Sequence, residues 1–183
     1  MSILNRVFCM VVAVAVVTIA QPARSAPVGG DNEAEVAGGF FHSQGSDNGS
    51  FNVDLQYGYY LTPGWEVGLR QGLNYNFVDD GPDSWLARTT PFLLYNFHLN
   101  ERVIPFVGAA MGLVWNDRDA TGLLGPQVGA KIFLTDQTYL GLRYQYEWFF
   151  NSLKRAGNNA DHGNHVGTIG FGFVWGGARK TSG

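Results

Sequence analysis

The chain has 183 residues, of which 45% are hydrophobic, 14% are aromatic and only 15% are charged. Its formal net charge of -3 is too close to neutral to indicate a nucleic-acid-binding protein, and its aromatic content argues against a disordered chain. The single cysteine, Cys9, excludes a disulfide framework and a cysteine-based zinc site.

Residues 1–25 are typical of a secretory signal peptide. Arg6 supplies a positive charge, and residues 7–20 form an uncharged apolar run followed by small residues suited to cleavage. As a helix this run is about 21 Å long, shorter than the roughly 30 Å hydrocarbon core of a bilayer. The alternative is an uncleaved membrane anchor. Because the run is too short to span a bilayer, we expect a cleaved signal peptide and an exported protein, with a short linker at residues 26–33.

From residue 34 onward the hydrophobic pattern has a period of two, which is typical of β-strands. In residues 65–77, Trp65 and Leu69 lie on an apolar face, whereas Glu66 and Arg70 lie on the opposite, polar face. The same alternation recurs along the chain. It predicts eight strands, at residues 34–42, 51–61, 65–77, 84–98, 104–115, 122–134, 139–149 and 165–175. Pro91, Pro105 and Pro126 could each mark a strand end or a bulge.

The connections between these strands alternate in length. The three short connections are residues 62–64, 99–103 and 135–137, and the four longer, polar connections are residues 43–50, 78–83, 116–121 and 151–164. Short turns at one end and longer loops at the other are typical of outer-membrane barrels. We therefore predict an all-β fold, an eight-stranded antiparallel up-and-down transmembrane β-barrel over residues 34–176. Both termini, including a tail at residues 177–183, would lie on the periplasmic side.

Alternation alone also fits a soluble barrel with an apolar lining. The polar face is rich in glycine, and an eight-stranded barrel has an interior just wide enough for side chains to fill. We therefore expect the glycine-rich face to point inward and the bulky face to meet lipid. The candidate inward charges are Asp54, Glu66, Arg70, Arg88, Lys131, Arg143 and Glu147. Their near balance predicts a salt-bridge network that plugs the lumen; the alternative is a solvated outer face.

Aromatic residues gather near the predicted strand ends, which is typical of the girdles at membrane interfaces. The alternative for any single residue is ordinary β-propensity. The girdle candidates are Phe51, Trp65, Tyr75, Phe77, Trp85, Phe97, Trp115, Trp148, Phe149, Phe173 and Trp175.

The last predicted strand resembles the C-terminal assembly motif of bacterial outer-membrane barrels. Thr168, Gly170, Phe173 and Trp175 match its pattern of polar, glycine, apolar and aromatic residues, although eight more residues follow. Residues 105–112 and 126–131 resemble strands of small OmpA/OmpX-type barrels. The resemblance implies an outer-membrane location, contact with lipid and lipopolysaccharide, and insertion by the barrel-assembly machinery.

Some barrels of this kind are enzymes that act on lipid A. Such an enzyme would need a nucleophile and a histidine that a carboxylate orients. The candidates are His42 with Ser43, and His162 or His165 with Glu147, whereas His98 stands apart. Surface loop histidines are the simpler interpretation, so we predict no catalytic site and no cofactor.

Two acidic loops are the candidate sites for divalent cations. They contain Asp79, Asp80 and Asp83, and Asp117 and Asp119, but neither has EF-hand spacing. Solvated polar loops are the simpler interpretation, so we predict no metal site.

The sequence thus predicts a non-enzymatic outer-membrane β-barrel with a structural or surface-recognition role through four exposed loops. The alternatives are a lipid A-modifying enzyme, a soluble periplasmic lipocalin-like carrier and, more weakly, a narrow pore. The membrane reading requires Leu69, Leu142 and Tyr144 to point outward while Arg70 and Arg143 point inward.

Overall fold

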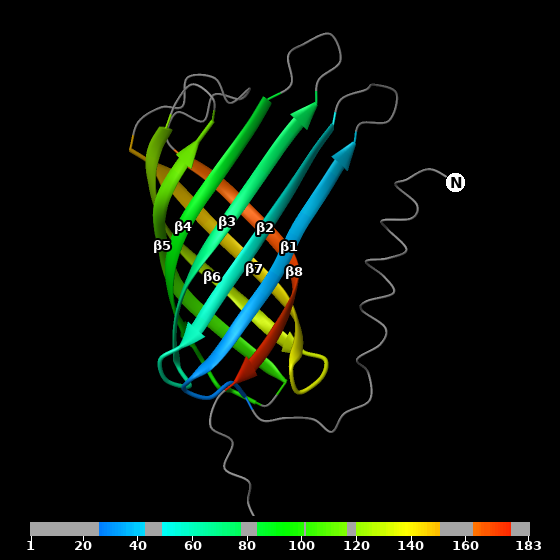
Figure 1. Ribbon diagram of the computed structural model, residues 1–183, viewed down its shortest axis with the longest axis vertical. Coiled ribbons are helices and arrows are strands. Elements are labelled where there is room, and N and C mark those ends of the chain that lie inside the picture. Colours follow the sequence, from blue (N-terminus) through cyan, green and yellow to red (C-terminus); the bar gives the residue numbers. More distant parts are fainter. Residues whose placement is uncertain are drawn as a thin grey trace, which may run out of the picture.

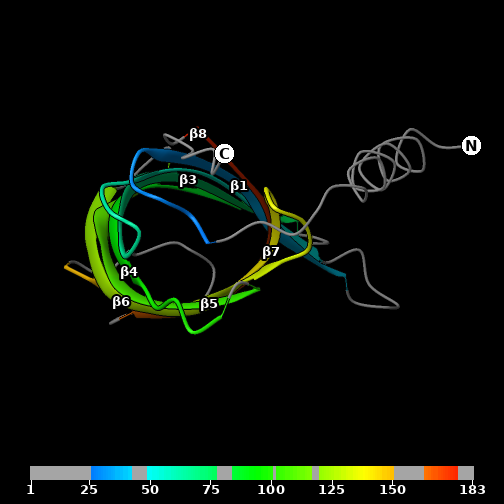
Figure 2. The ribbon, with the colours of Figure 1, turned by 90° about the horizontal axis from the view of Figure 1, so that it is seen from below.

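The computed structural model describes residues 26–42, 49–77, 84–100, 102–116, 120–150 and 163–176. Antiparallel strands pair in chain order, and β1 pairs with β8, which closes the barrel (Figures 1 and 2). The predicted fold class is therefore confirmed. The strands are β1 (Asp31–His42), β2 (Gly49–Tyr60), β3 (Trp65–Phe77), β4 (Ser84–Asn96), β5 (Val103–Trp115), β6 (Ala120–Phe133), β7 (Thr138–Phe149) and β8 (Gly163–Gly176).

The strand boundaries differ from the predicted ones by a few residues. The largest difference is at β1, which begins at Asp31 rather than at residue 34, so residues 31–33 belong to the barrel wall and not to the linker. Polar residues at the start of β1 concealed it, because no apolar alternation precedes Ala34. The predicted signal peptide and C-terminal tail lie outside the described residues.

The three prolines lie within strands. Pro91 and Pro126 each lie where the ladder to the next strand lacks rungs, and the pairs on either side keep one register. Neither position is therefore a strand end or a bulge. Pro105 lies near the start of β5, where its carbonyl accepts a hydrogen bond from the Phe97 N–H at 2.7 Å.

The short turns lie at the lower end of the barrel in Figure 1. Hydrogen bonds between side chains and the backbone stabilise two of them. In the β4–β5 turn, Asn100 Oδ1 accepts a hydrogen bond from the Val103 N–H at 2.7 Å. In the β6–β7 turn, Thr135 Oγ1 accepts a hydrogen bond from the Thr138 N–H at 3.0 Å. Such local bonds favour tight turns because they satisfy backbone groups that no strand partner reaches.

The apolar face of the wall points outward. Leu69, Leu142 and Tyr144 are 50%, 39% and 47% exposed, whereas Arg70 and Arg143 are 4% and 8% exposed. This arrangement contradicts the soluble carrier, which would line its cavity with the apolar face. Strands of 12–14 residues, tilted by about 45°, span about 30 Å, the thickness of a hydrocarbon core. Within the described residues, the structure has no helix that is long and apolar enough to cross a membrane.

Some aromatic rings lie inside the barrel, where each covers a glycine on the neighbouring strand. A Cβ atom at any of these glycines would lie 2.0–2.4 Å from the nearest ring carbon. The absence of that atom makes room for large side chains in a narrow lumen. The register pairs are Phe92–Gly68, Phe106–Gly129 and Tyr139–Gly172.

One predicted girdle residue also lies inside. Phe149 packs against the buried pair Val114 and Leu123 rather than facing lipid. Its neighbour Trp148 is the outward residue at this end of β7. The prediction for Phe149 was wrong because adjacent residues of a strand point to opposite faces.

Candidate functional site

Lys131 of β6 lies at the centre of a cluster in the lower half of the barrel. Its Nζ atom lies 2.5 Å from Glu33 Oε2 and 2.7 Å from Glu66 Oε2, and it donates to the Tyr60 hydroxyl at 2.8 Å. None of these four side chains is more than 1% exposed. A charge so deeply buried persists only when it is paired and hydrogen-bonded, which is the case here.

Further side chains complete the hydrogen bonding of Glu33. The Tyr139 hydroxyl donates to its Oε1 atom at 2.6 Å, and the Tyr60 hydroxyl donates to its Oε2 atom at 2.7 Å. Gln56 Nε2 donates to Oε1 at 3.2 Å. Since Asn96 of β4 donates to Glu66, the cluster joins side chains from six strands, β1–β4, β6 and β7.

A chain of alternating charges lies above this cluster. Arg143 Nη1 lies 3.0 Å from Glu35 Oε1, and its Nη2 lies 3.4 Å from Asp54 Oδ2. Arg88 continues the chain, at 3.1 Å from Asp54 Oδ1 and 3.3 Å from Glu147 Oε1. Asp54 thus bridges two arginines across the lumen.

Arg70 differs from the other interior cations because its bonds go to neutral amides. Its Nη2 atom donates to Gln56 Oε1 at 2.8 Å and to Gln127 Oε1 at 3.1 Å, and its Nη1 donates to Gln145 Oε1 at 2.9 Å. The guanidinium carbon also lies 5.2 Å from the centre of the Phe92 ring, a cation–π contact.

A small cavity remains between the arginines. Its volume of about 10 Å³ is about the room that one water molecule requires. Glu147 Oε2, a buried oxygen without a hydrogen-bond partner among the described residues, belongs to a side chain that lines it. Below this cavity, the side chains around Lys131 fill the lumen. The interior therefore argues against an open pore.

The structure places all seven predicted inward charges in the barrel interior. It joins six of them in ion pairs and leaves Arg70 among amides. The prediction missed Glu33 and Glu35, which raise the number of ion-paired carboxylates to five, and it missed Asp31, which is also fully buried on the inner face of β1. The alternation of the two glutamates with Ala34 and Val36 in the sequence was the signal that could have found them.

The motif residues of β8 follow the same alternation. Thr168 and Gly170 lie on the inner face, and Gly170 leaves space for Ala37 of β1, whose Cβ lies 2.7 Å from where a Cβ would stand. Phe173 is exposed on the outer face, where its ring stacks with Trp175 at 5.9 Å between centroids. A role of these residues in assembly stays a prediction.

The histidine and carboxylate that a lipid A enzyme would need do not meet at His165. Glu147 points into the barrel, whereas His165 is exposed on the outer face and bonds to Tyr144. His98 is exposed just beyond β4. The side chain of His42 lies outside the described part of the chain, as do Ser43 and His162.

The acidic residues of the two candidate cation loops also lie outside the described part of the chain. Where the chain is described, no three His, Cys, Asp or Glu residues form a group that could hold a metal ion.

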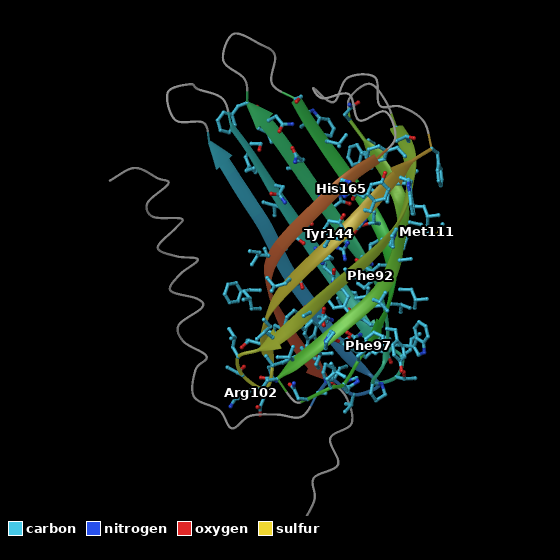
Figure 3. All side chains as sticks on the ribbon, turned by 180° about the vertical axis from the view of Figure 1, so that it is seen from behind. Phe92, Phe97, Arg102, Met111, Tyr144 and His165 are labelled. Carbon is cyan, nitrogen blue, oxygen red and sulfur yellow. The ribbon has the colours of Figure 1, made fainter. Side chains whose placement is uncertain are left out.

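Arg88→Met is expected to lower the free energy of unfolding by about 1.5–3 kcal/mol, the range for one charged hydrogen bond, because Glu147 loses its cation whereas Asp54 keeps Arg143. Arg102→Met is the matched control, since Arg102 is exposed in the β4–β5 turn (Figure 3) and should change stability by less than about 0.5 kcal/mol. Urea titration of the folded barrel in detergent micelles measures both. Equal effects of the two substitutions would contradict the interior pairing.

The profile of one protein family, described as the outer membrane protein beta-barrel domain, matches residues 9–175. The chain belongs to this family. The protein is therefore an outer-membrane barrel of the small eight-stranded kind, as predicted. A search of curated proteins found no match.

Solved structures share the fold at low sequence identity. The N-terminal β-barrel domain of OprF from Pseudomonas aeruginosa is 17% identical, with a TM-score of 0.52, over 81% of this chain and 100% of that one. Neisserial surface protein A is 18% identical, with a TM-score of 0.55, over 79% of this chain and 94% of that one. OprG from Pseudomonas aeruginosa is 14% identical, with a TM-score of 0.55, over 84% and 99% of the two chains.

Proposed function

We propose that this protein is a non-enzymatic outer-membrane barrel that acts through its four longer connections, with a structural or surface-recognition role. The observation that carries the proposal is the closed interior. Side chains from six strands meet at Lys131, and the level above holds a cavity no larger than about one water molecule. A lumen filled in this way supports neither a channel nor a substrate pocket.

The longer connections are then the parts best placed to contact partners outside the cell. They all join strands at the end opposite the short turns, which is the extracellular end in barrels of this type. By sequence, residues 43–50, 78–83, 116–121 and 151–164 contain seven acidic and three basic residues. This acidic surface would favour partners that carry positive charge or divalent cations.

The test expresses the chain in a bacterial outer membrane beside a variant in which Asn-Gly turns replace the four longer connections. We expect cells with the full chain to adhere more strongly to a cationic, polylysine-coated surface than cells with the shortened barrel. Equal adherence would overturn the recognition role. Mass spectrometry of lipid A from the same cells should show no change, and a changed acyl or phosphate pattern would instead support the enzyme.

A further inference from the structure

A polar pair interrupts the lipid-facing surface of β7 and β8. The Tyr144 hydroxyl and His165 Nδ1 lie 2.5 Å apart, and both side chains are exposed on the outer face (Figure 3). The next outward pair below them is Leu142 and Ile169, register partners that are both exposed. Leu140 and Phe171 form the next pair, so below Tyr144 and His165 this outer face is apolar, as lipid requires.

The pair lies within the group of aromatic residues at the upper end of β7. Tyr146 is the register partner of His165, with 4.8 Å between the two ring centroids, and it packs edge-on against Trp148 at 4.9 Å. Tryptophan side chains favour the membrane–water interface. Two residues along a tilted strand change the depth by about 5 Å. Tyrosine favours the interface as well, so Tyr144, Tyr146 and Trp148 form one aromatic belt, and the Tyr144–His165 pair lies within about 5–10 Å of its upper edge, at the headgroup level.

The hydrogen bond within the pair leaves one proton donor unused. If Tyr144 donates to Nδ1, the imidazole carries its proton on Nε2; if Nδ1 donates, the tyrosine O–H remains. Within the described part of the chain, no second partner takes this proton. A donor that faces lipid without a partner is unfavourable, so an acceptor from the lipid itself would stabilise it.

We propose that Tyr144 and His165 bind a phosphate oxygen of an outer-leaflet lipid. Phosphate supplies strong acceptors at this depth, and protonated histidine would add charge to the bond. The source is either lipid A or a phospholipid. The site does not include the longer connections, although it rests on the barrel orientation assumed in the proposed function. In a bilayer with identical leaflets, lipid binding can be measured whichever way the barrel inserts, so the test does not depend on loop function.

A second outward pair provides a matched control at the opposite end of the barrel. The Tyr57 hydroxyl lies 2.6 Å from Asn32 Oδ1, to which it donates its single proton. Tyr57 packs beside Trp175, with 6.4 Å between centroids. Tyr57→Phe therefore removes an outward hydroxyl of the same kind without touching the proposed site.

The experiment reconstitutes the full mature barrel in nanodiscs of phosphatidylcholine. Each preparation is doped with bis-phosphorylated lipid A, with lipid A lacking both phosphates, or with phosphatidylglycerol. Native mass spectrometry counts the doped lipid that stays with the protein after its release into detergent. We expect Tyr144→Phe/His165→Phe to retain at least fivefold less bis-phosphorylated lipid A than the wild type, whereas Tyr57→Phe retains as much.

The lipid arms identify the source of the phosphate. If the wild type retains bis-phosphorylated lipid A but not dephosphorylated lipid A, the bond is assigned to a lipid A phosphate. If the wild type retains phosphatidylglycerol equally well and the double variant loses it, the bond is assigned to a phospholipid. Retention by the double variant equal to the wild type in every arm overturns the proposal. If the double variant does not fold, the single variant Tyr144→Phe provides the test, because it removes one oxygen and keeps the ring. We expect it to retain at least threefold less bis-phosphorylated lipid A than the wild type.

Discussion

Lys131→Met is expected to lower the free energy of unfolding by about 3–5 kcal/mol, the range for removing one partner from a buried ion pair. The substitution leaves Glu33 and Glu66 without their cation, and both carboxylates are fully buried. Methionine fills a similar volume, so the loss reports the charge rather than a cavity. Tryptophan fluorescence during urea titration in detergent micelles measures the change.

The control removes the uncompensated charges together with the lysine. In Lys131→Met/Glu33→Gln/Glu66→Gln, neutral amides replace the two carboxylates, and we expect the variant to recover at least half of the lost stability, because a buried charge cluster and its neutral replacement differ little in free energy. A loss below about 1 kcal/mol for Lys131→Met alone would contradict the structure of this cluster.

Gly172→Ala is expected to destabilise the barrel by at least about 3 kcal/mol. The added Cβ would lie 2.0 Å from Tyr139 Cζ and 2.3 Å from its hydroxyl oxygen. The ring must then move, and the hydroxyl would lose the hydrogen bond that its single proton makes to Glu33 at 2.6 Å, with Glu35 Oε2 also near at 3.0 Å. Overpacking costs about 1–3 kcal/mol, and each hydrogen bond to a charged group about 1.5–3 kcal/mol.

Gly167→Ala on the same strand is the matched control. No atom lies within 4 Å of a Cβ added there, so the substitution should leave stability unchanged or raise it slightly. The same urea titration compares the two variants. Equal losses would show that the glycines act through strand propensity and not through the space they leave for Tyr139.

Most of the fold could be predicted from the alternation of apolar and polar residues along each strand. Leu69 beside Arg70, and Leu142 beside Arg143, were enough to assign the two faces, because successive strand residues point to opposite sides. The same rule, applied to Phe149 beside Trp148, would have placed Phe149 inside. That error arose from grouping aromatic residues by their place near a strand end without regard to phase.

The partners within the interior could not be read from the sequence. Glu33 and Lys131 are 98 residues apart and lie on strands that are not neighbours. Their contact depends on the tilt and stagger of the closed barrel, which a single strand does not encode. Tyr139 is a further case, since its place over Gly172 requires the β7–β8 register.

The orientation of the wall in a bilayer is the central claim, and spin labels test it most directly. Labels at Leu69→Cys and Leu142→Cys, in a chain that starts at residue 26 and so lacks Cys9, should relax with dissolved oxygen and not with an aqueous nickel complex. A label at Leu99→Cys, in the exposed β4–β5 turn, should respond to nickel. Nickel accessibility at Leu69→Cys and Leu142→Cys equal to that at Leu99→Cys would contradict a lipid-facing wall.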